Sequence, residues 1–251
     1  MNQCSSILKE MNKIAEESEF WMGKEDDESL KISRNFIDKM SWLIDLCIYN
    51  DNRVLDMGKG NKKGKKGKNQ KDDEKEQKDT EFEILNLSEF KAEFDSTDMQ
   101  VVTPDEIPEP QNQRLLKNLN GHAMALQIIR YGQLKSSQCK TAYLKVLEKA
   151  YIFLIRFVRG NKENSNTILE YIEDFYNDLH LGVHAIELIM EIFVDNENLI
   201  TFEMTGLVKR LANVIQEIDF DQTKKSTLIS FMPRFMEYNG NHIKTIQNLI
   251  L

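Results

Sequence analysis

Long hydrophobic runs are missing from this chain of 251 residues. Its longest unbroken apolar stretch covers residues 150–155 and ends at Arg156, whereas a membrane-spanning helix needs about 20 such residues. We therefore expect no membrane span. Proline and glycine are also scarce, at 4 and 11 residues. Collagen-like, proline-rich and all-β chains need more of these turn-forming residues, so the composition argues against all three.

Cysteine is rare and shows no pairing pattern. Cys4, Cys47 and Cys139 are odd in number, and none belongs to a CxxC motif. We therefore expect reduced thiols in a cytosolic setting rather than a disulfide framework or a zinc site. The N-terminus has no basic region followed by an apolar block, so we expect no secretory signal.

An excess of basic residues is absent too, since the net charge is −8. Residues 1–110 hold 17 Lys and Arg against 26 Asp and Glu, whereas residues 111–251 hold 16 against 15. Proteins that bind nucleic acids present a basic face, so we expect no nucleic-acid partner. The nearly neutral C-terminal part is typical of a module whose surface meets other protein.

What the sequence does contain is helical periodicity, beginning in residues 1–57. Apolar side chains recur there at spacings of three and four. This spacing predicts one helix over residues 4–15 and a second from an N-cap at Ser33 to Ile48. We expect the charged residues 24–28 to form the loop between them.

A linker separates this helical segment from the rest. Residues 58–80 contain no aliphatic or aromatic side chain, so they cannot offset the entropy of ordering and are predicted to be disordered. Their Lys/Gly-rich half is compatible with a nucleic-acid, lipid or nuclear-import patch, but the acidic half follows at once, which favours a solvated insertion. Residues 81–110 form a mixed segment, with a possible short helix over 82–94. Prolines predict an extended chain over 103–111.

Residues 111–251 have one proline and helical periodicity throughout. The predicted helix over 147–158 should end at Gly160, and the one over 168–179 should end near Gly182. Pro233 should kink or divide the predicted helix over 221–236. Short connections between successive helices predict an all-α fold, either an armadillo-like α-solenoid of antiparallel helix pairs or a compact bundle. The predicted helices cover residues 115–129, 147–158, 168–179, 183–193, 201–218, 221–236 and 243–250.

The candidate reactive side chains form no catalytic constellation. His180 and His184 have the i, i+4 spacing of two metal ligands on one helix face, but a glycine lies between them and no third ligand follows. His122 lies on an apolar helix face, where a hydrogen-bonded core histidine is expected. Cys139 has no histidine near it in sequence that could activate its thiol, and the acidic pair at 173–174 is expected on a helix surface.

Motifs for nucleotide binding, nucleophilic catalysis and EF-hand calcium binding do not occur in the sequence. We therefore predict that the chain is not an enzyme. We also predict no catalytic, cofactor-binding or metal-binding residues.

Four segments stand out, in this order along the chain: QRLLKNLNGHAMALQII at 113–129, FLIRFVRGNKEN at 153–164, FVDNENL at 193–199 and NGNHIKTIQNLI at 239–250. Together they resemble the homology domain shared by inositol trisphosphate receptors and ryanodine receptors, which are intracellular calcium-release channels. The similarity is closest to the second copy of that domain in the inositol trisphosphate receptors. Pro233 and the insertion at 58–80 depart from the family pattern.

The resemblance implies an armadillo-like module on the cytosolic side of the endoplasmic reticulum or another internal calcium store. Its expected role is to transmit conformational change to a pore that this chain lacks. Other domains or subunits of a homotetrameric channel are the partners that the resemblance implies. The family's ligand-binding residues have no counterpart here, so none is assigned.

The GNKEN sequence also has a direct physical interpretation. Gly160 can adopt a positive φ and end a helix, while Asn161 and Asn164 can bond backbone groups that the helix end leaves free. We therefore expect these residues to be structural rather than chemical.

The chain ends in Asn-Leu-Ile-Leu, inside an apolar helical pattern, and we interpret it as a fragment of a larger polypeptide. Two alternatives stay open. The first is a free-standing armadillo-like scaffold for other proteins, which would be soluble in the cytoplasm. The second, ranked last, is an enzyme that uses His180 and His184 with a metal.

Overall fold

The computed structural model describes residues 2–16, 27–49, 105–133, 141–193 and 203–217, together with residues 226, 229 and 230 and two short strands. Nearly all of this part of the chain is helical. Its elements are α1 (Asn2–Glu16), α3 (Asp27–Leu46), α6 (Pro110–Asn118), α7 (Gly121–Gln133), α8 (Thr141–Val158), α9 (Lys162–Leu169), α10 (Ile172–Asp178), the 3-10 helix η1 (Leu179–Leu181), α11 (Ala185–Phe193), α12 (Glu203–Glu217), β1 (Glu237–Tyr238) and β2 (Asn241–His242).

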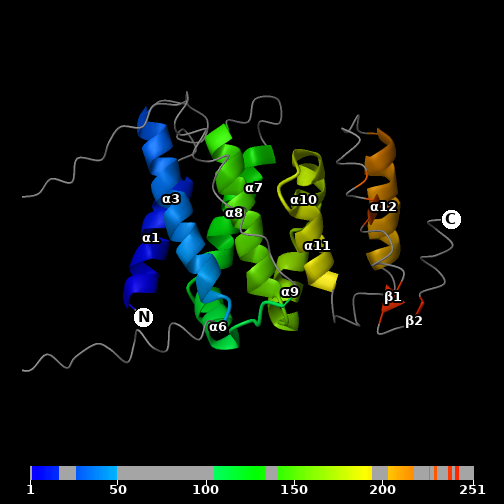
Figure 1. Ribbon diagram of the computed structural model, residues 1–251, viewed down its shortest axis with the longest axis horizontal. Coiled ribbons are helices and arrows are strands. Elements are labelled where there is room, and N and C mark those ends of the chain that lie inside the picture. Colours follow the sequence, from blue (N-terminus) through cyan, green and yellow to red (C-terminus); the bar gives the residue numbers. More distant parts are fainter. Residues whose placement is uncertain are drawn as a thin grey trace, which may run out of the picture.

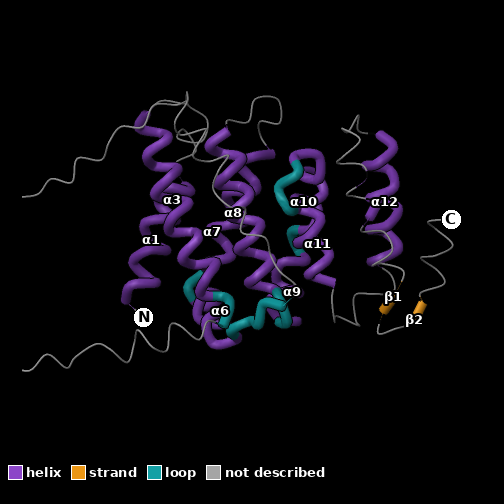
Figure 2. Tube along the Cα trace, in the orientation of Figure 1, coloured by secondary structure: helices purple, strands orange, loops and turns teal. Residues whose placement is uncertain are grey.

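The long helices stand side by side in a row (Figure 1). The row runs from α1 and α3 through α7 and α8 to α10 and α11, with α12 beyond them. Helix α8 is central, because it contacts α3, α7, α9 and α11. The short helices α6 and α9 lie at the lower end of the row in this view, where α8 ends (Figure 2). None of the described helices combines the length and the apolarity needed to cross a bilayer.

The apolar run in α8 explains its central position. Every residue from 150 to 158 is buried, because a helix that is apolar on all sides must be surrounded by other helices. Phe153 and Phe157 stack within this core, with ring centroids 5.9 Å apart. The one charged side chain in this stretch is Arg156, which is as buried as its apolar neighbours.

The all-α prediction is confirmed for the described residues, apart from one pair of two-residue strands. α1, α11 and α12 lie where the periodicity placed them, and α8 stops before Gly160, which has φ +63°. Strands β1 and β2 pair antiparallel. They lie between two predicted helices and flank an Asn-Gly dipeptide, which is a common hairpin signal.

The predicted N-cap at Ser33 is wrong, because α3 begins at Asp27 and Ser33 is buried inside it. Residues 27 and 28 therefore belong to the helix and not to the predicted loop. The sequence held a signal for this earlier start, because acidic residues are enriched in the first turn of helices and the stretch 25–28 is entirely acidic.

Two predicted helices are each divided in the structure. Residues 115–129 belong to α6 and α7, separated at Asn120, which has φ +56°. Asparagine tolerates the left-handed conformation better than most residues, so it can end a helix without glycine. Residues 168–179 are likewise shared between α9, α10 and η1, with the break at Glu170 and Tyr171.

Several predictions fall outside the described residues. These concern the linker at 58–80, the part of the 81–110 segment up to residue 104, the last helix at 243–250, Pro233 and Cys139. The extended chain predicted over 103–111 is wrong at its end, because α6 begins at Pro110. Residues 226, 229 and 230 are helical, as the predicted helix over 221–236 requires. Cys4 and Cys47 are buried thiols that form no disulfide within the described residues.

Candidate functional site

Several elements that are separate in sequence exchange polar contacts at the C-terminal end of α8. A helix end leaves its last carbonyl groups without partners within the helix, and at this end side chains from other helices bond them. Gln113 of α6 donates through Nε2 to the carbonyls of Arg156 and Arg159, at 2.9 Å each. Because Gln113 is 1% exposed, water has little access to replace these bonds.

Helix α9 supplies the second set of caps. Asn164 Nδ2 donates to the Phe157 carbonyl at 2.8 Å, and Ser165 Oγ donates to the Val158 carbonyl at 3.5 Å. Asn161 is the N-cap of α9 and accepts from the Asn164 amide at 3.1 Å. The predicted roles of Gly160, Asn161 and Asn164 at this helix end are therefore confirmed.

The two caps are joined to each other. Asn161 Nδ2 donates to Gln113 Oε1 at 3.2 Å. Gln113 thus uses both ends of its amide, donating to α8 and accepting from the start of α9. Residues 113 and 153–164, which lie in two of the four segments carrying the family resemblance, meet at this point.

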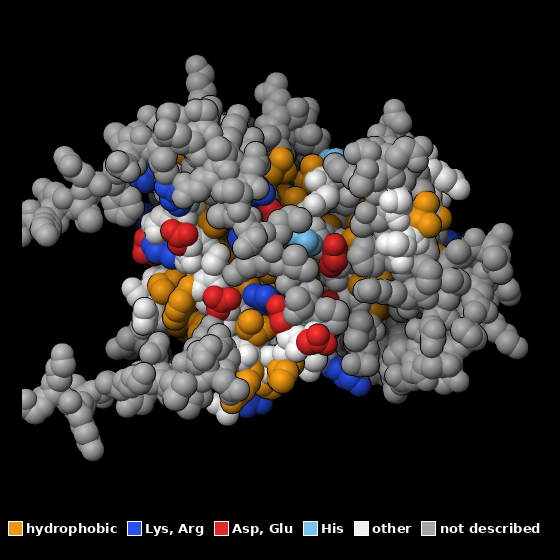
Figure 3. Space-filling view, viewed as in Figure 1, with side chains coloured by type: hydrophobic (Ala, Val, Ile, Leu, Met, Phe, Trp, Pro, Cys, Tyr) orange, Lys and Arg blue, Asp and Glu red, His pale blue; other side chains and the backbone are white. Residues whose placement is uncertain are grey.

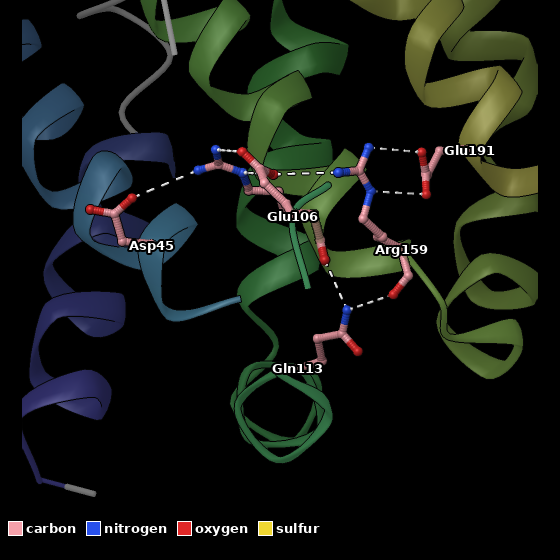
Figure 4. A network of polar contacts seen from close by, with 6 residues as sticks. Asp45, Glu106, Gln113, Arg159 and Glu191 are labelled. Atoms are coloured by element: carbon pink, nitrogen blue, oxygen red, sulfur yellow. Dashed lines mark hydrogen bonds and ion pairs between the residues drawn. The ribbon is translucent and has the colours of Figure 1, made fainter. Parts of the chain in front are cut away.

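An ion-pair network surrounds the capped end (Figure 4). Arg156 binds Glu106 with two nitrogens, of which Nε lies 2.8 Å from Oε2. Arg159 binds Glu191 of α11 in the same forked way, at 3.1 and 3.2 Å, and its third nitrogen lies 3.4 Å from Glu106. A further nitrogen of Arg156 lies 3.7 Å from Asp45 of α3. We call these five residues the α8-end network.

The α8-end network joins elements that are far apart in sequence. Arg156 and Arg159 place positive charge at the end of α8, where the helix dipole is negative. The Arg156 and Glu106 side chains are only 5% and 12% exposed. Removing one partner of such a pair leaves a buried charge uncompensated, at a cost of about 3–5 kcal/mol. The arrangement therefore connects α3, α8, α11 and the chain before α6 through ion pairs.

Glu106 is held in position by a short backbone bridge. The Tyr49 amide donates to the Ile107 carbonyl at 2.8 Å, and the Glu109 amide donates to the Cys47 carbonyl at 2.8 Å. Pro110 then occupies the first turn of α6, where a missing amide hydrogen has no cost. The bridge thus holds residues 47–49 next to residues 107–109, beside the α8-end network.

The surface over these elements carries both signs of charge. Among the described side chains on the face shown in Figure 3, acidic and basic ones lie interspersed among apolar ones. Salt bridges of the described chain include Lys117–Glu163 at 2.7 Å and Arg130–Asp174 at 2.8 Å.

His180 and His184 do not share a helix face. His180 belongs to η1, Gly182 follows with φ +73°, and His184 has φ +63° just before α11. His184 instead lies between Glu148, at 3.7 Å, and Glu187, at 3.4 Å. Burial by itself lowers the pKa of His184, but hydrogen bonding to the two carboxylates outweighs it and raises the pKa to about 9. This histidine is therefore a cation that links α8 to α11.

The other candidates also differ from expectation. His122 stacks on Phe157 at 5.5 Å, and its buried Nδ1 has no hydrogen-bond partner in the described chain. The expected hydrogen bond is therefore missing at this atom, and burial lowers the pKa of His122. The 173–174 pair is split, since the Glu173 side chain is 62% exposed but that of Asp174 only 19%.

Within the described ranges, no three His, Cys, Asp or Glu side chains gather as a metal site would require. The polar residues that do gather are the α8-end network and Gln113, and sequence reasoning assigned them no role. One signal was present: Arg156 interrupts the longest apolar run in the chain, and a charge in an otherwise buried stretch needs partners.

No known protein-family model matches this chain. The resemblance to the calcium-release channels therefore stays a prediction that rests on the four segments.

Proposed function

We propose that this chain is a cytosolic coupling module of an intracellular calcium-release channel of the inositol trisphosphate receptor type. In this proposal it is part of a larger polypeptide, and four copies of that polypeptide form a homotetrameric channel at the endoplasmic reticulum or another internal calcium store. It passes conformational change from ligand-sensing domains to a pore that lies elsewhere in that polypeptide. It performs no catalysis of its own.

The observation that carries the proposal is the meeting of two resembling segments at the end of α8. Gln113 opens the first segment, and Asn161 and Asn164 belong to the second. Their side chains bond each other and the same helix end. Residues of a shared motif that assemble one buried joint support a common structural role.

The α8-end network supports coupling in particular. Densely packed and ion-paired joints move as units, so a displacement of one element is passed to the others. Asp45 belongs to α3, Glu106 to the chain before α6, and Glu191 to α11. A shift of α3 would therefore reach α11 through the arginines of α8.

For the finer architecture, we propose an armadillo-like α-solenoid of antiparallel helix pairs. The row of neighbouring helices in Figure 1 supports it, with α1 beside α3, α7 beside α8 and α10 beside α11. Stacked pairs of this kind rotate slightly against each other, which suits a part that transmits movement.

The first test is the size and location of the native polypeptide. An antibody against residues 111–251 would be applied to internal-membrane and soluble fractions. The proposal expects a band of several hundred kilodaltons in internal membranes. A single soluble band near 29.4 kDa would overturn it and favour the free-standing scaffold that binds other proteins.

The second test addresses coupling directly. In the native polypeptide, Arg159→Gln would be compared with Arg114→Gln, since Arg114 lies on the exposed face of α6. We expect Arg159→Gln to weaken calcium release triggered by inositol trisphosphate at unchanged protein level and ligand binding. The Arg114 control should leave release unchanged. Equal release from both variants would contradict the role of the α8-end network.

A further inference from the structure

Helix α10 is attached to its neighbours by an unusual combination of contacts. On its inner side, Tyr151 of α8 donates a hydrogen bond to Asp178 Oδ2 at 2.8 Å. Tyr151 is 0% exposed and Asp178 is 1% exposed. Phe175 packs edge-on against the Tyr151 ring, with centroids 6.0 Å apart. The carboxyl group of Asp178 is thus enclosed by α8 and its own helix.

No cation of the described chain is paired with Asp178. Arg130 of α7, a helix that packs against α10, instead binds Asp174, one turn earlier, at 2.8 Å. A buried carboxylate that receives one neutral hydrogen bond and no counter-charge is costly, so the neutral acid is favoured. Burial, with the charge of Asp174 adding to it, raises the pKa of Asp178 to about 7, although the Tyr151 hydrogen bond lowers it.

On its outer side, α10 is held by two similar surface clamps. Arg130 of α7 lies 4.8 Å from the centroid of the Tyr171 ring while it binds Asp174. Arg210 of α12 lies 4.8 Å from the Tyr176 ring centroid and donates to Glu173 at 2.8 Å. Each clamp combines a cation–π contact with an ion pair.

We propose that α10 is a pH-responsive joint, whose inner attachment to α8 holds while Asp178 carries a proton and loosens when Asp178 ionises. The arginine clamps to α7 and α12 do not depend on this proton, so the loosening is local and the helix stays tethered. The joint goes beyond the coupling role proposed above and stands or falls independently of it.

The groups that face this joint define the controls. On α10 itself Asp174 adds negative charge, and on α8 Tyr143 and Tyr151 lie near enough to influence Asp178 or its partner. Two histidines follow closely in the chain, His180 in η1 and His184 before α11. Histidines as a class titrate in the same range as the proposed transition, so each needs its own variant.

The test is hydrogen exchange measured by mass spectrometry on the full chain, with protection factors corrected for the intrinsic effect of pH. If the pKa of Asp178 is about 7 in the closed joint and 3.8 in the open one, linkage predicts about 30-fold lower protection of α10 at pH 8.5 than at pH 5.5. Asp178→Asn, a neutral isostere, should abolish this dependence when the comparison is made in His184→Gln proteins, because the raised pKa of His184 also reduces stability above pH 6.5. His180→Gln and His184→Gln should retain it.

A second variant tests the same joint without removing the acid. Tyr151→Phe deletes the hydrogen bond that favours the ionised carboxylate, so the midpoint of the transition should move to higher pH. The proposal is overturned if wild-type protection of α10 is independent of pH. It is also overturned if Asp178→Asn keeps the dependence in the His184→Gln protein, if either histidine variant removes it, or if Tyr151→Phe leaves the midpoint in place.

Discussion

The sharpest prediction concerns the amide of Gln113, which Gln113→Glu would replace with a carboxylate of the same shape. Nε2 donates to two carbonyls of the α8 end at 2.9 Å. An ionised carboxylate cannot donate, and its charge would face two carbonyl oxygens at the negative end of the α8 dipole. The substitution changes no packing volume, so its effect isolates the capping bonds.

The expected cost follows from the number of bonds and from burial. A buried acceptor left without its partner costs about 1–3 kcal/mol. The two carbonyls together therefore cost about 2–6 kcal/mol, a large share of the roughly 5–15 kcal/mol that stabilises an ordinary domain. Because protonation restores a donor, the deficit of Gln113→Glu should shrink as the pH falls.

The assay is urea unfolding followed by far-UV circular dichroism, with Gln111→Glu as the matched control. Gln111 lies on the same helix but is exposed, and a carboxylate near a helix N-terminus is neutral or slightly stabilising. We expect Gln113→Glu alone to lower the unfolding midpoint strongly. A change below about 0.5 kcal/mol, the usual range for surface substitutions, would refute the capping role of Gln113.

Three further predictions follow. Gly160→Ala should destabilise the fold by about 1–2 kcal/mol in a thermal melt, because φ is +63° and the added Cβ would lie 3.2 Å from Pro108. In the same assay, Gly206→Ala should stabilise the fold by up to about 1 kcal/mol, because Gly206 lies in a helix with open space around it. His184→Gln should flatten the pH dependence of the free energy of unfolding between pH 6.5 and 9. The raised pKa of His184 stabilises the fold by about 3 kcal/mol below pH 6.5, and this contribution is lost by about pH 9. An unchanged slope would contradict the pairing of His184 with the two carboxylates. Replacing residues 58–80, which the sequence predicts to be disordered, with a short Gly-Ser linker should preserve cooperative unfolding and add up to about 1 kcal/mol through lower loop-closure entropy; loss of cooperativity in calorimetry would disprove it.

Local features of the fold were predictable because each depends on a few neighbouring residues. Apolar spacing located α1, α11 and α12, and the positive φ that glycine permits explains why α8 ends before Gly160. The roles of Asn161 and Asn164 followed in the same way, since an N-cap bonds an amide only three residues away. Such interactions are fixed by sequence spacing alone.

The breaks within apolar stripes were harder to predict. The stripe over residues 115–129 continues through Asn120 because both α6 and α7 face the same core. Only the left-handed φ of Asn120 shows where one helix ends. Apolar spacing reports which face is buried, and it does not report whether the backbone runs unbroken beneath it.

The sequence by itself determined the all-α class, most helix positions and the chemistry of the turn after α8. Only the tertiary structure decided which polar groups meet. Arg156 pairs with Glu106 across 50 residues of sequence, Arg159 with Glu191 across 32, and Tyr151 with Asp178 across 27. No local pattern encodes such partners, because they depend on how the helices pack. The same packing excludes water from Arg156 and Asp178, and this loss of hydration is what makes a charge at these positions costly.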